Sequence, residues 1–190
     1  MHLFTESFFN RSYNRRLFIK ASIIGLSSLF CRPAPCIARE KLPEGKLTLF
    51  NVHTNDKLSV TYRNAYGEYD TEALKALNWI LRCHYSGQAI DIDTHVIEFV
   101  NLTDKQLGGN NEIHIISGYR SPQYNELLMG EGRHVVKNSL HIVGKAIDIR
   151  IPRVALSRVR DVALDLRLGG VGYYRHSDFV HLDCGRFRTW

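Results

Sequence analysis

The sequence predicts an α+β fold, with a small and mostly antiparallel sheet flanked by helices. Two observations lead to this class. Several segments alternate apolar and polar residues with a period of two, which is typical of half-buried strands. Other segments repeat apolar residues at helical spacing behind a capping residue, which is typical of amphipathic helices.

The strand pattern occurs in five separate segments after residue 45. The alternating segments are residues 46–52, 57–62, 112–116, 146–151 and 179–183. The first two flank Asn55-Asp56, and this arrangement predicts a hairpin.

The helical pattern begins at Asp70, which is placed to cap a helix with Leu74, Leu77 and Leu81 on one face. Further helices are expected over residues 94–107, from Ser121-Pro122 onward, and over residues 154–168, where Gly169-Gly170 would end the last one.

The first 38 residues have the layout of an export signal. A basic stretch precedes an apolar run, and Ala38 is a suitable last residue before cleavage. Residues 14–20 resemble a twin-arginine signal, although Asn14 and Ile19 depart from its usual pattern; an ordinary arginine-rich secretory signal is the alternative. The apolar run is shorter than the roughly 20 residues that span a bilayer, so no membrane span is expected in the mature form. Residues 39–190 would form one periplasmic domain.

The charge of the chain owes much to this leader. The whole sequence has 25 Lys and Arg against 19 Asp and Glu, and residues 1–38 contain 5 and 1 of these, which leaves the mature part at +2. No basic stripe with interleaved aromatics is present, so nucleic acid is not an expected partner.

Three residues are candidate zinc ligands: His141, Asp148 and His181. Strand alternation puts Asp148 and His181 on polar faces, while His141 lies in a loop that Gly144 allows to turn. Ser139 either orients the site or caps that turn, and we favour the structural role. Two imidazoles and a carboxylate suit a catalytic zinc site with one position open to water. The spacing of His141 and Asp148, taken alone, also fits a surface histidine and a strand-end aspartate.

Four longer motifs carry a resemblance to a known family. They are Ser117-Gly118-Tyr119-Arg120-Ser121, Ser139-x-His141-x-x-Gly144-x-Ala146-x-Asp148, Gly169-Gly170-Val171-Gly172-Tyr173-Tyr174 and Phe179-Val180-His181-x-Asp183-x-Gly185. Together, over about residues 47–190, they resemble the YcbK/MepK-like periplasmic murein endopeptidases. These belong to the zinc peptidase group that includes D-alanyl-D-alanine carboxypeptidases and hedgehog-type domains.

The resemblance implies one Zn²⁺ per chain, held by His141, Asp148 and His181. It also implies hydrolysis of the peptide cross-links of peptidoglycan, with the bond between two meso-diaminopimelate residues favoured. Arg120 corresponds to an arginine that contacts a substrate carboxylate or carbonyl in this group, and a structural ion pair is its alternative role.

A general base is also needed. Asp178 occupies the position of the catalytic acid in the carboxypeptidase branch, and we expect it to be the base. Asp183 is the rival base, or else it supports the His181 imidazole through its other ring nitrogen.

Two other functions remain open at this point. A D,D- or L,D-carboxypeptidase that trims stem peptides would use the same metal site with a pocket for a terminal carboxylate. A non-catalytic wall-binding module would use zinc structurally and predicts a closed coordination shell. An adaptor that delivers the enzyme to the wall is left open as well.

The remaining cysteines and histidines have weaker patterns. Cys83 and Cys184 would persist after cleavage and could pair in an oxidising periplasm, and alternation puts Cys184 on the face opposite His181. His176 and Tyr173 lie near enough in sequence to line the cleft. The histidines interpreted as surface or packing residues are His53, His84, His95, His114, His134 and His176.

Overall fold

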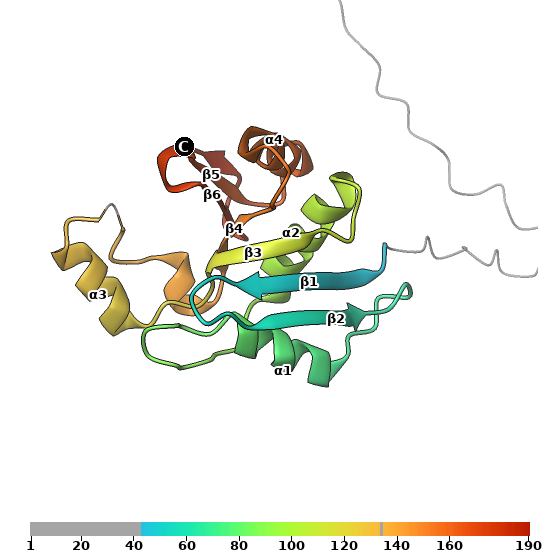
Figure 1. The fold of residues 1–190 in the computed structure, drawn as a ribbon, viewed down its shortest axis with the longest axis horizontal. Helices are drawn as coiled ribbons and strands as arrows, with labels where there is room; N and C mark the ends of the chain where they lie inside the picture. Colours follow the sequence, from blue (N-terminus) through green and yellow to red (C-terminus); the bar gives the residue numbers. More distant parts are fainter. Residues whose placement is uncertain (1–42, 134) are drawn as a thin grey trace, which may run out of the picture. The chain divides into compact units, whose positions relative to one another are not determined.

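The computed structural model describes residues 43–133 and 135–190 (Figure 1). The expected export signal and His134 therefore lie outside the described residues. The strands are β1 (Gly45–Asn51), β2 (Lys57–Arg63), β3 (Glu112–Ser117), β4 (Ala146–Arg150), β5 (Gly170–Tyr174), β6 (Phe179–Asp183) and β7 (Arg188–Thr189). The helices are α1 (Thr71–Ile80), α2 (Thr94–Gln106), α3 (Pro122–Gly130) and α4 (Leu156–Leu166), with short 3-10 helices η1 (Leu140–Val143) and η2 (Arg175–Ser177).

The seven strands form one mixed sheet in the order β2-β1-β3-β4-β6-β5-β7. The pairs β1–β2, β3–β4, β4–β6 and β5–β6 are antiparallel, whereas β1–β3 and β5–β7 are parallel. The predicted hairpin turns through Asn55, at a φ of 59°. The α+β class and the mostly antiparallel sheet are confirmed.

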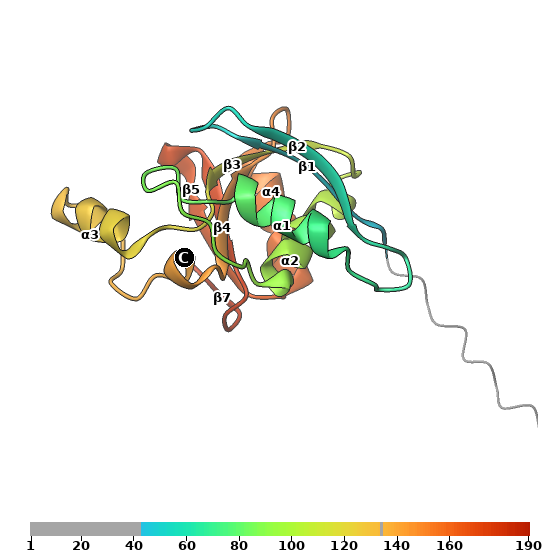
Figure 2. The same cartoon turned by 90° about the horizontal axis from the view of Figure 1, so that it is seen from below.

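The two faces of this sheet have different surroundings. On one face, Ile147 and Ile149 of β4 and Val180 and Leu182 of β6 are at most 2 % exposed and belong to the hydrophobic core. Helices α2 and α4 pack against β6, and α1 packs against the β1–β2 hairpin (Figure 2). Because side chains alternate along a strand, the polar residues of β4 and β6 lie on the face that these helices do not cover.

The helix starts follow the predicted capping residues. The side chain of Asp70 caps α1, and Ser121 caps α3 with Pro122 in its first turn. Helix α4 ends earlier than expected, with Arg167 in the left-handed conformation, so the prediction that Gly169-Gly170 end it is wrong. Glycine is required at 169 for another reason, since a Cβ there would collide with the Asp183 carbonyl oxygen.

Within the described residues, no helix has both the length and the apolar composition needed to cross a membrane.

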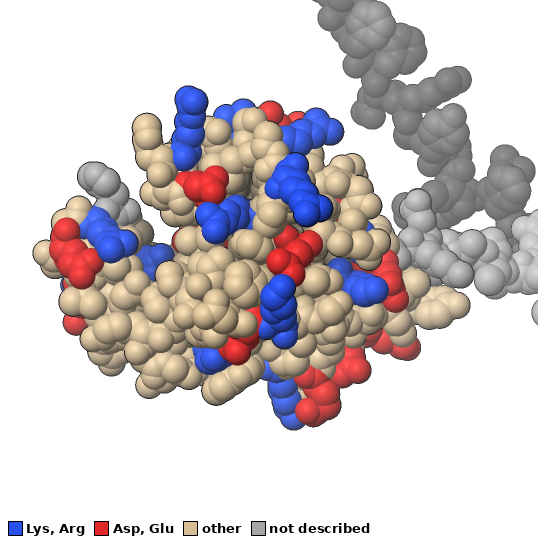
Figure 3. All heavy atoms as spheres, in the orientation of Figure 1, with Lys and Arg blue, Asp and Glu red and all other residues tan. Residues whose placement is uncertain are grey.

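Two adjoining cavities lie between two parts of the chain. Helix α3 and the segment that follows it form one side, and the β5–β6 hairpin forms the other. The volumes of the two cavities are about 320 Å³ and about 550 Å³. Figure 3 shows a hollow in this region, with Lys and Arg side chains on both sides of it.

Candidate active site

The β4–β6 strand pair brings two candidate ligands together. Asp148 of β4 lies directly opposite His181 of β6 in the antiparallel register. The distance from His181 Nδ1 to Asp148 Oδ1 is 2.7 Å. Asp148 is 4 % exposed and the His181 side chain is 12 % exposed. The prediction that these two residues share a polar strand face is therefore confirmed.

His141 reaches the same point from η1. Ser139 caps this turn by accepting a hydrogen bond from the His141 N–H, and Gly144 ends it at a φ of 67°. Both residues act as the sequence predicted. His141 Nε2 lies 3.2 Å from Asp148 Oδ1 and 3.2 Å from His181 Nδ1.

The segment Ser117-Gly118-Tyr119-Arg120 orients the His141 ring. His141 Nδ1 lies 2.8 Å from the Gly118 carbonyl oxygen, which can only accept, so Nδ1 carries the proton. A Cβ at residue 118 would collide with the backbone carbonyl oxygen of Leu81, which explains the glycine. The lone pair of His141 Nε2 therefore faces Asp148 and His181.

Asp183 orients His181 in the same manner. Its Oδ2 lies 3.1 Å from His181 Nε2, so this nitrogen donates and Nδ1 turns its lone pair toward Asp148. Arg188 and the backbone N–H groups of Gly170 and Gly185 also donate to the fully buried Asp183 carboxylate. Burial acts to raise the pKa of Asp183, but the bonds to His181 and Arg188 lower it to about 2.

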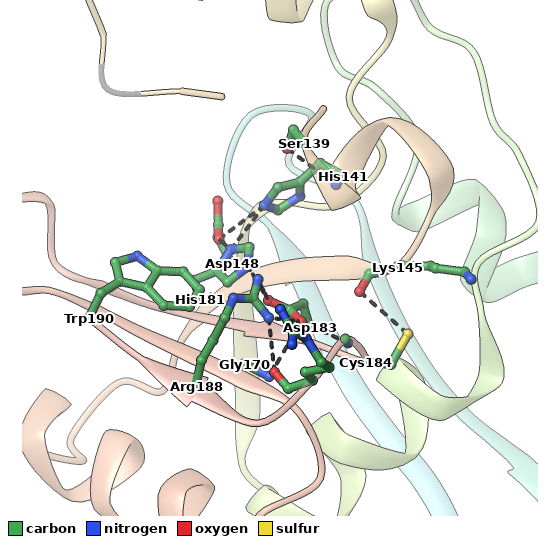
Figure 4. Close-up of polar contacts among 12 residues, drawn as sticks. Ser139, His141, Lys145, Asp148, Gly170, His181, Asp183, Cys184, Arg188 and Trp190 are labelled. Carbon is green, nitrogen blue, oxygen red and sulfur yellow. Dashed lines mark hydrogen bonds and ion pairs between the residues drawn. The ribbon is translucent and has the colours of Figure 1, made fainter. Parts of the chain in front are cut away.

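Three lone pairs thus converge on one point (Figure 4). One ligand atom each of His141, Asp148 and His181 lies within 4.8 Å of the other two. With both imidazoles neutral, these lone pairs repel one another, and a proton or a metal cation between them removes the repulsion. Two imidazole nitrogens and a carboxylate oxygen are donors that zinc accepts. The residues present therefore fit a divalent metal ion.

The electrostatics of the metal-free cluster agree with this fit. Burial acts to raise the pKa of Asp148, but the His141 and His181 imidazoles hold it well below its usual range. Burial also acts to lower the pKa of His181, yet Asp148 and Asp183 raise it to about 9. The centre of the cluster consequently favours a positive charge.

Arg120 borders the cluster and is only partly hydrogen-bonded. The residue is 8 % exposed, and its Nη2 lies 3.8 Å from Asp148 Oδ2. Its Nη groups donate to Asn125 Oδ1 at 3.3 Å and Ser117 Oγ at 3.5 Å, while Nε has no hydrogen-bond partner among the described residues. Burial lowers the pKa of Arg120. An incompletely paired buried guanidinium is suited to bind a carboxylate or carbonyl oxygen.

The structure does not bring Asp178 into this cluster. Asp178 follows η2 in the left-handed conformation, and its side chain is 63 % exposed. Its Oδ2 accepts a hydrogen bond from Arg150 Nη1 at 3.0 Å, and the residue lines a separate cavity beside His114. Its role as general base stays a prediction.

Trp190 and Tyr174, which the sequence patterns do not place in the cleft, line the 320 Å³ cavity. Trp190 Nε1 donates to the Tyr174 hydroxyl at 2.8 Å, and the Trp190 ring centroid lies 5.4 Å from that of His181. The expectation that Tyr173 and His176 line the cleft is wrong, because Tyr173 packs against the core on the other face and His176 borders neither cavity. Alternation along β5, counted from Gly172 opposite His181, would have pointed to Tyr174.

The cysteines take no part in the cluster. Cys83 is buried and Cys184 is partly buried, and both thiols are free, so the possible disulfide is not formed. Cys184 Sγ contacts the Lys145 carbonyl oxygen at 3.6 Å, away from His181 as alternation predicted.

Comparison with known proteins identifies the family. A family model described as Peptidoglycan L,D-endopeptidase MepK (Peptidase_M15_2) matches residues 41–190. The chain is 35 % identical over 178 residues to Peptidoglycan L,D-endopeptidase MepK of Escherichia coli (strain K12), which covers 93 % of this chain and 97 % of that protein. It is 38 % identical over 169 residues to the probable peptidoglycan L,D-endopeptidase MepK of Haemophilus influenzae. This alignment covers 88 % of this chain and 89 % of that protein.

These matches, together with the fold and the cluster, define a hydrolase of the peptidase class. Within that class, the chain belongs to the MepK family of peptidoglycan L,D-endopeptidases. The resemblance seen in the sequence motifs is therefore confirmed.

Proposed function

We propose that this chain is a zinc-dependent murein endopeptidase that hydrolyses the peptide cross-links of peptidoglycan during cell-wall growth or remodelling. The observation that carries the proposal is the convergence of three lone pairs at His141, Asp148 and His181. Family membership supports the reaction class, since the relatives are named peptidoglycan L,D-endopeptidases. The cross-link between two meso-diaminopimelate residues is the favoured substrate on the same grounds.

His141, Asp148 and His181 would hold one Zn²⁺ per chain and leave a coordination position for water or substrate. When bound, Zn²⁺ polarises a carbonyl group and lowers the pKa of water to about 7. The chain prepares this site in advance. The Gly118 carbonyl and the Asp183 carboxylate fix the tautomers of the two imidazoles, so no ring has to turn when the metal binds.

Arg120 would hold the substrate beside the metal. Arg120 lines both cavities, and its Nη groups, which make only long hydrogen bonds to Asn125 and Ser117, can donate to a carbonyl or carboxylate oxygen. Because Arg120 is buried, such a bond lies in a low-dielectric environment and orients the peptide strongly.

Asp178 is our candidate for the general base, which takes a proton from the attacking water and returns it to the leaving amine. Among the described residues that line the two cavities, the only side-chain carboxylate is that of Asp148, a proposed metal ligand. Asp183 is fully occupied by His181 and Arg188. To act as base, Asp178 must leave Arg150, and an exposed ion pair of this kind contributes only about 0–1 kcal/mol.

The shape of the cleft favours endopeptidase over carboxypeptidase activity. The two cavities share Arg120 and Asp148 and therefore adjoin beside the cluster, which leaves space for peptide on both sides of a bond placed there. A carboxypeptidase needs only one such direction and a closed pocket for the chain end.

The site of action that we propose is the periplasm. Residues 1–38 would serve as the export signal, with the twin-arginine route favoured, and residues 39–190 as the mature domain. This part of the proposal depends on the sequence pattern of the leader alone.

The test is digestion of purified cross-linked muropeptides by the zinc-loaded protein, by the chelator-treated protein and by a zinc-supplemented His181→Ala variant. We expect zinc-dependent conversion of dimers to monomers, with the variant at least about 10³-fold slower because it loses a ligand. The masses of the products identify the bond that is cut. Release of terminal alanine alone would indicate a carboxypeptidase, and a folded, metal-loaded protein that changed neither dimers nor monomers would contradict murein hydrolysis.

A further inference from the structure

The larger of the two cavities contains residues that the proposed chemistry does not use. It has a volume of about 550 Å³ and shares Arg120, Asp148, Tyr174 and Phe179 with the cavity that holds the cluster. It is also lined by His53 and His84, which the sequence pattern indicated as surface or packing residues. We call the part of this cavity lined by His53, His84, Ser117, Arg120 and Tyr124 the His53–His84 arm.

The two histidines of this arm are stacked on each other. Their ring centroids are 3.9 Å apart and their planes differ by 14°. His53 follows β1, and its Nε2 lies 3.0 Å from the Ile116 carbonyl oxygen, so this nitrogen donates and anchors the ring. The stack therefore joins the β1–β2 turn to the loop after α1.

His84 has the stacked His53 on one side and Tyr124 of α3 packed edge-on against it, at a centroid distance of 4.9 Å. Aromatic packing holds the ring in place, yet no described residue makes a hydrogen bond to either of its ring nitrogens. At least one of these nitrogens always carries a proton. The arm consequently contains a positioned N–H donor with unused capacity.

The charged side chains that line the cavity are mostly positive, although Arg133 is paired with Glu131. Arg120 and Arg133 line the cavity, and the sole carboxylate among its lining residues is Asp148, which the metal would neutralise. Burial lowers the pKa of His84, and electrostatic interactions with His53 and Arg120 lower it further. Arg120, which is 8 % exposed, lines the same arm. These groups together favour an anion.

We propose that the His53–His84 arm binds a free carboxylate of the substrate peptide on one side of the scissile bond, and so selects stem peptides that carry this charge. His84 and Arg120 donate to the carboxylate, and His53 positions His84 from behind. This proposal rests on the proposed function, because it assigns a specificity site to the same cleft. A peptide in which the carboxylate is amidated keeps its shape but loses the negative charge, so it is bound more weakly.

The experiment uses the zinc-loaded full chain and two synthetic cross-linked peptides, identical except that the carboxylate beside the scissile bond is free in one and amidated in the other. The variant is His84→Phe, which keeps the aromatic packing on His53 and Tyr124 but removes the N–H donor. The matched control is His95→Phe, because His95 has a side chain that is 84 % exposed and contacts Asp93, far from the arm's lining. Thermal unfolding checks that both variants fold.

We expect the wild-type protein to have a KM about tenfold lower for the free-carboxylate peptide than for the amidated one. In His84→Phe this preference falls to within about twofold, while His95→Phe retains it. The proposal is overturned if the wild type shows no preference, or if His84→Phe keeps the whole preference.

Calorimetric binding of the same two peptides separates this proposal from the proposed function. The wild type could cleave neither peptide but bind the free-carboxylate peptide more tightly in a His84-dependent way. That result would contradict the proposed endopeptidase activity and support the carboxylate-binding role of the arm. If both peptides are cleaved and bound equally well, the arm fails and the endopeptidase stands.

Discussion

Two arginines are buried among the described residues, and they are partnered in opposite ways. Arg63, at the end of β2, is 3 % exposed, and its guanidinium donates to both carboxylate oxygens of Glu98 and to the carbonyl oxygens of Pro43 and Asn64. Arg120, beside the cluster, is 8 % exposed, lacks a partner at Nε and has its nearest carboxylate oxygen 3.8 Å away.

The difference between the two regions also appears in their electrostatics. Hydrogen bonds to Glu98 raise the pKa of Arg63, whereas burial lowers that of Arg120. A completely paired buried charge joins two parts of the scaffold, here the β1–β2 hairpin and α2. An incompletely paired one keeps its capacity for a ligand, at some cost to stability. The comparison therefore distinguishes a charge that is fully used by the fold from one that is only partly used by it.

The largest effect is expected from Arg63→Met. This change removes a buried guanidinium and leaves Glu98, whose side chain is 19 % exposed, with only the Tyr69 hydroxyl as partner, and we expect the free energy of unfolding to fall by about 3–5 kcal/mol. Denaturant unfolding measures the loss, and the remaining folded protein should keep its kcat. A loss below about 1 kcal/mol would mean that the pair is not structural.

Besides the two buried arginines, Arg150 makes an exposed ion pair with Asp178, and Asp178→Asn tests what this carboxylate does. If Asp178 is the base, kcat on cross-linked peptides falls about 10³-fold while zinc content is unchanged. The matched control is Arg150→Gln, which frees Asp178 and should keep kcat within about threefold of the wild-type value. Equal and small effects of both changes would remove Asp178 from the mechanism.

Arg120→Met should show the reverse of Arg63→Met. We expect kcat/KM to fall about 10²-fold, because a charged hydrogen bond to the substrate is lost. The free energy of unfolding should stay within about 1 kcal/mol of the wild-type value or rise, since an incompletely paired buried charge is replaced by an apolar group. Destabilisation by several kcal/mol with normal kcat/KM in the folded fraction would make Arg120 structural.

The smallest effect is expected from Asp183→Asn, which weakens the hold on His181 without removing a ligand. Zinc affinity, measured by competition with a chromophoric chelator, should fall about 10- to 100-fold. Asp161→Asn is a suitable control, because Asp161 contacts Arg160 on the surface. Unchanged zinc affinity in a folded Asp183→Asn protein would remove Asp183 from its positioning role.

Much of the cluster could be predicted because strand alternation is a local property. A period of two put Asp148, His181 and Asp183 on polar faces, and β4 and β6 pair in the register that brings the first two together. The turn at Ser139 and Gly144 is likewise encoded within a few residues. The error at Tyr173 was an error of register, since β5 places Tyr174 beside the cluster and Tyr173 opposite Val180.

The partners of the charged and aromatic side chains, in contrast, could not be predicted from local sequence patterns. Asp178 contacts Arg150, and His84 packs between His53 and Tyr124, all across separations that no local pattern encodes. The sequence by itself determined the three residues of the cluster and the strand faces, because side-chain direction follows from the backbone of a few neighbouring residues. Only the tertiary structure decided which buried charges are fully paired and which remain available to a ligand, because burial and hydrogen bonding depend on segments that meet after the chain has folded.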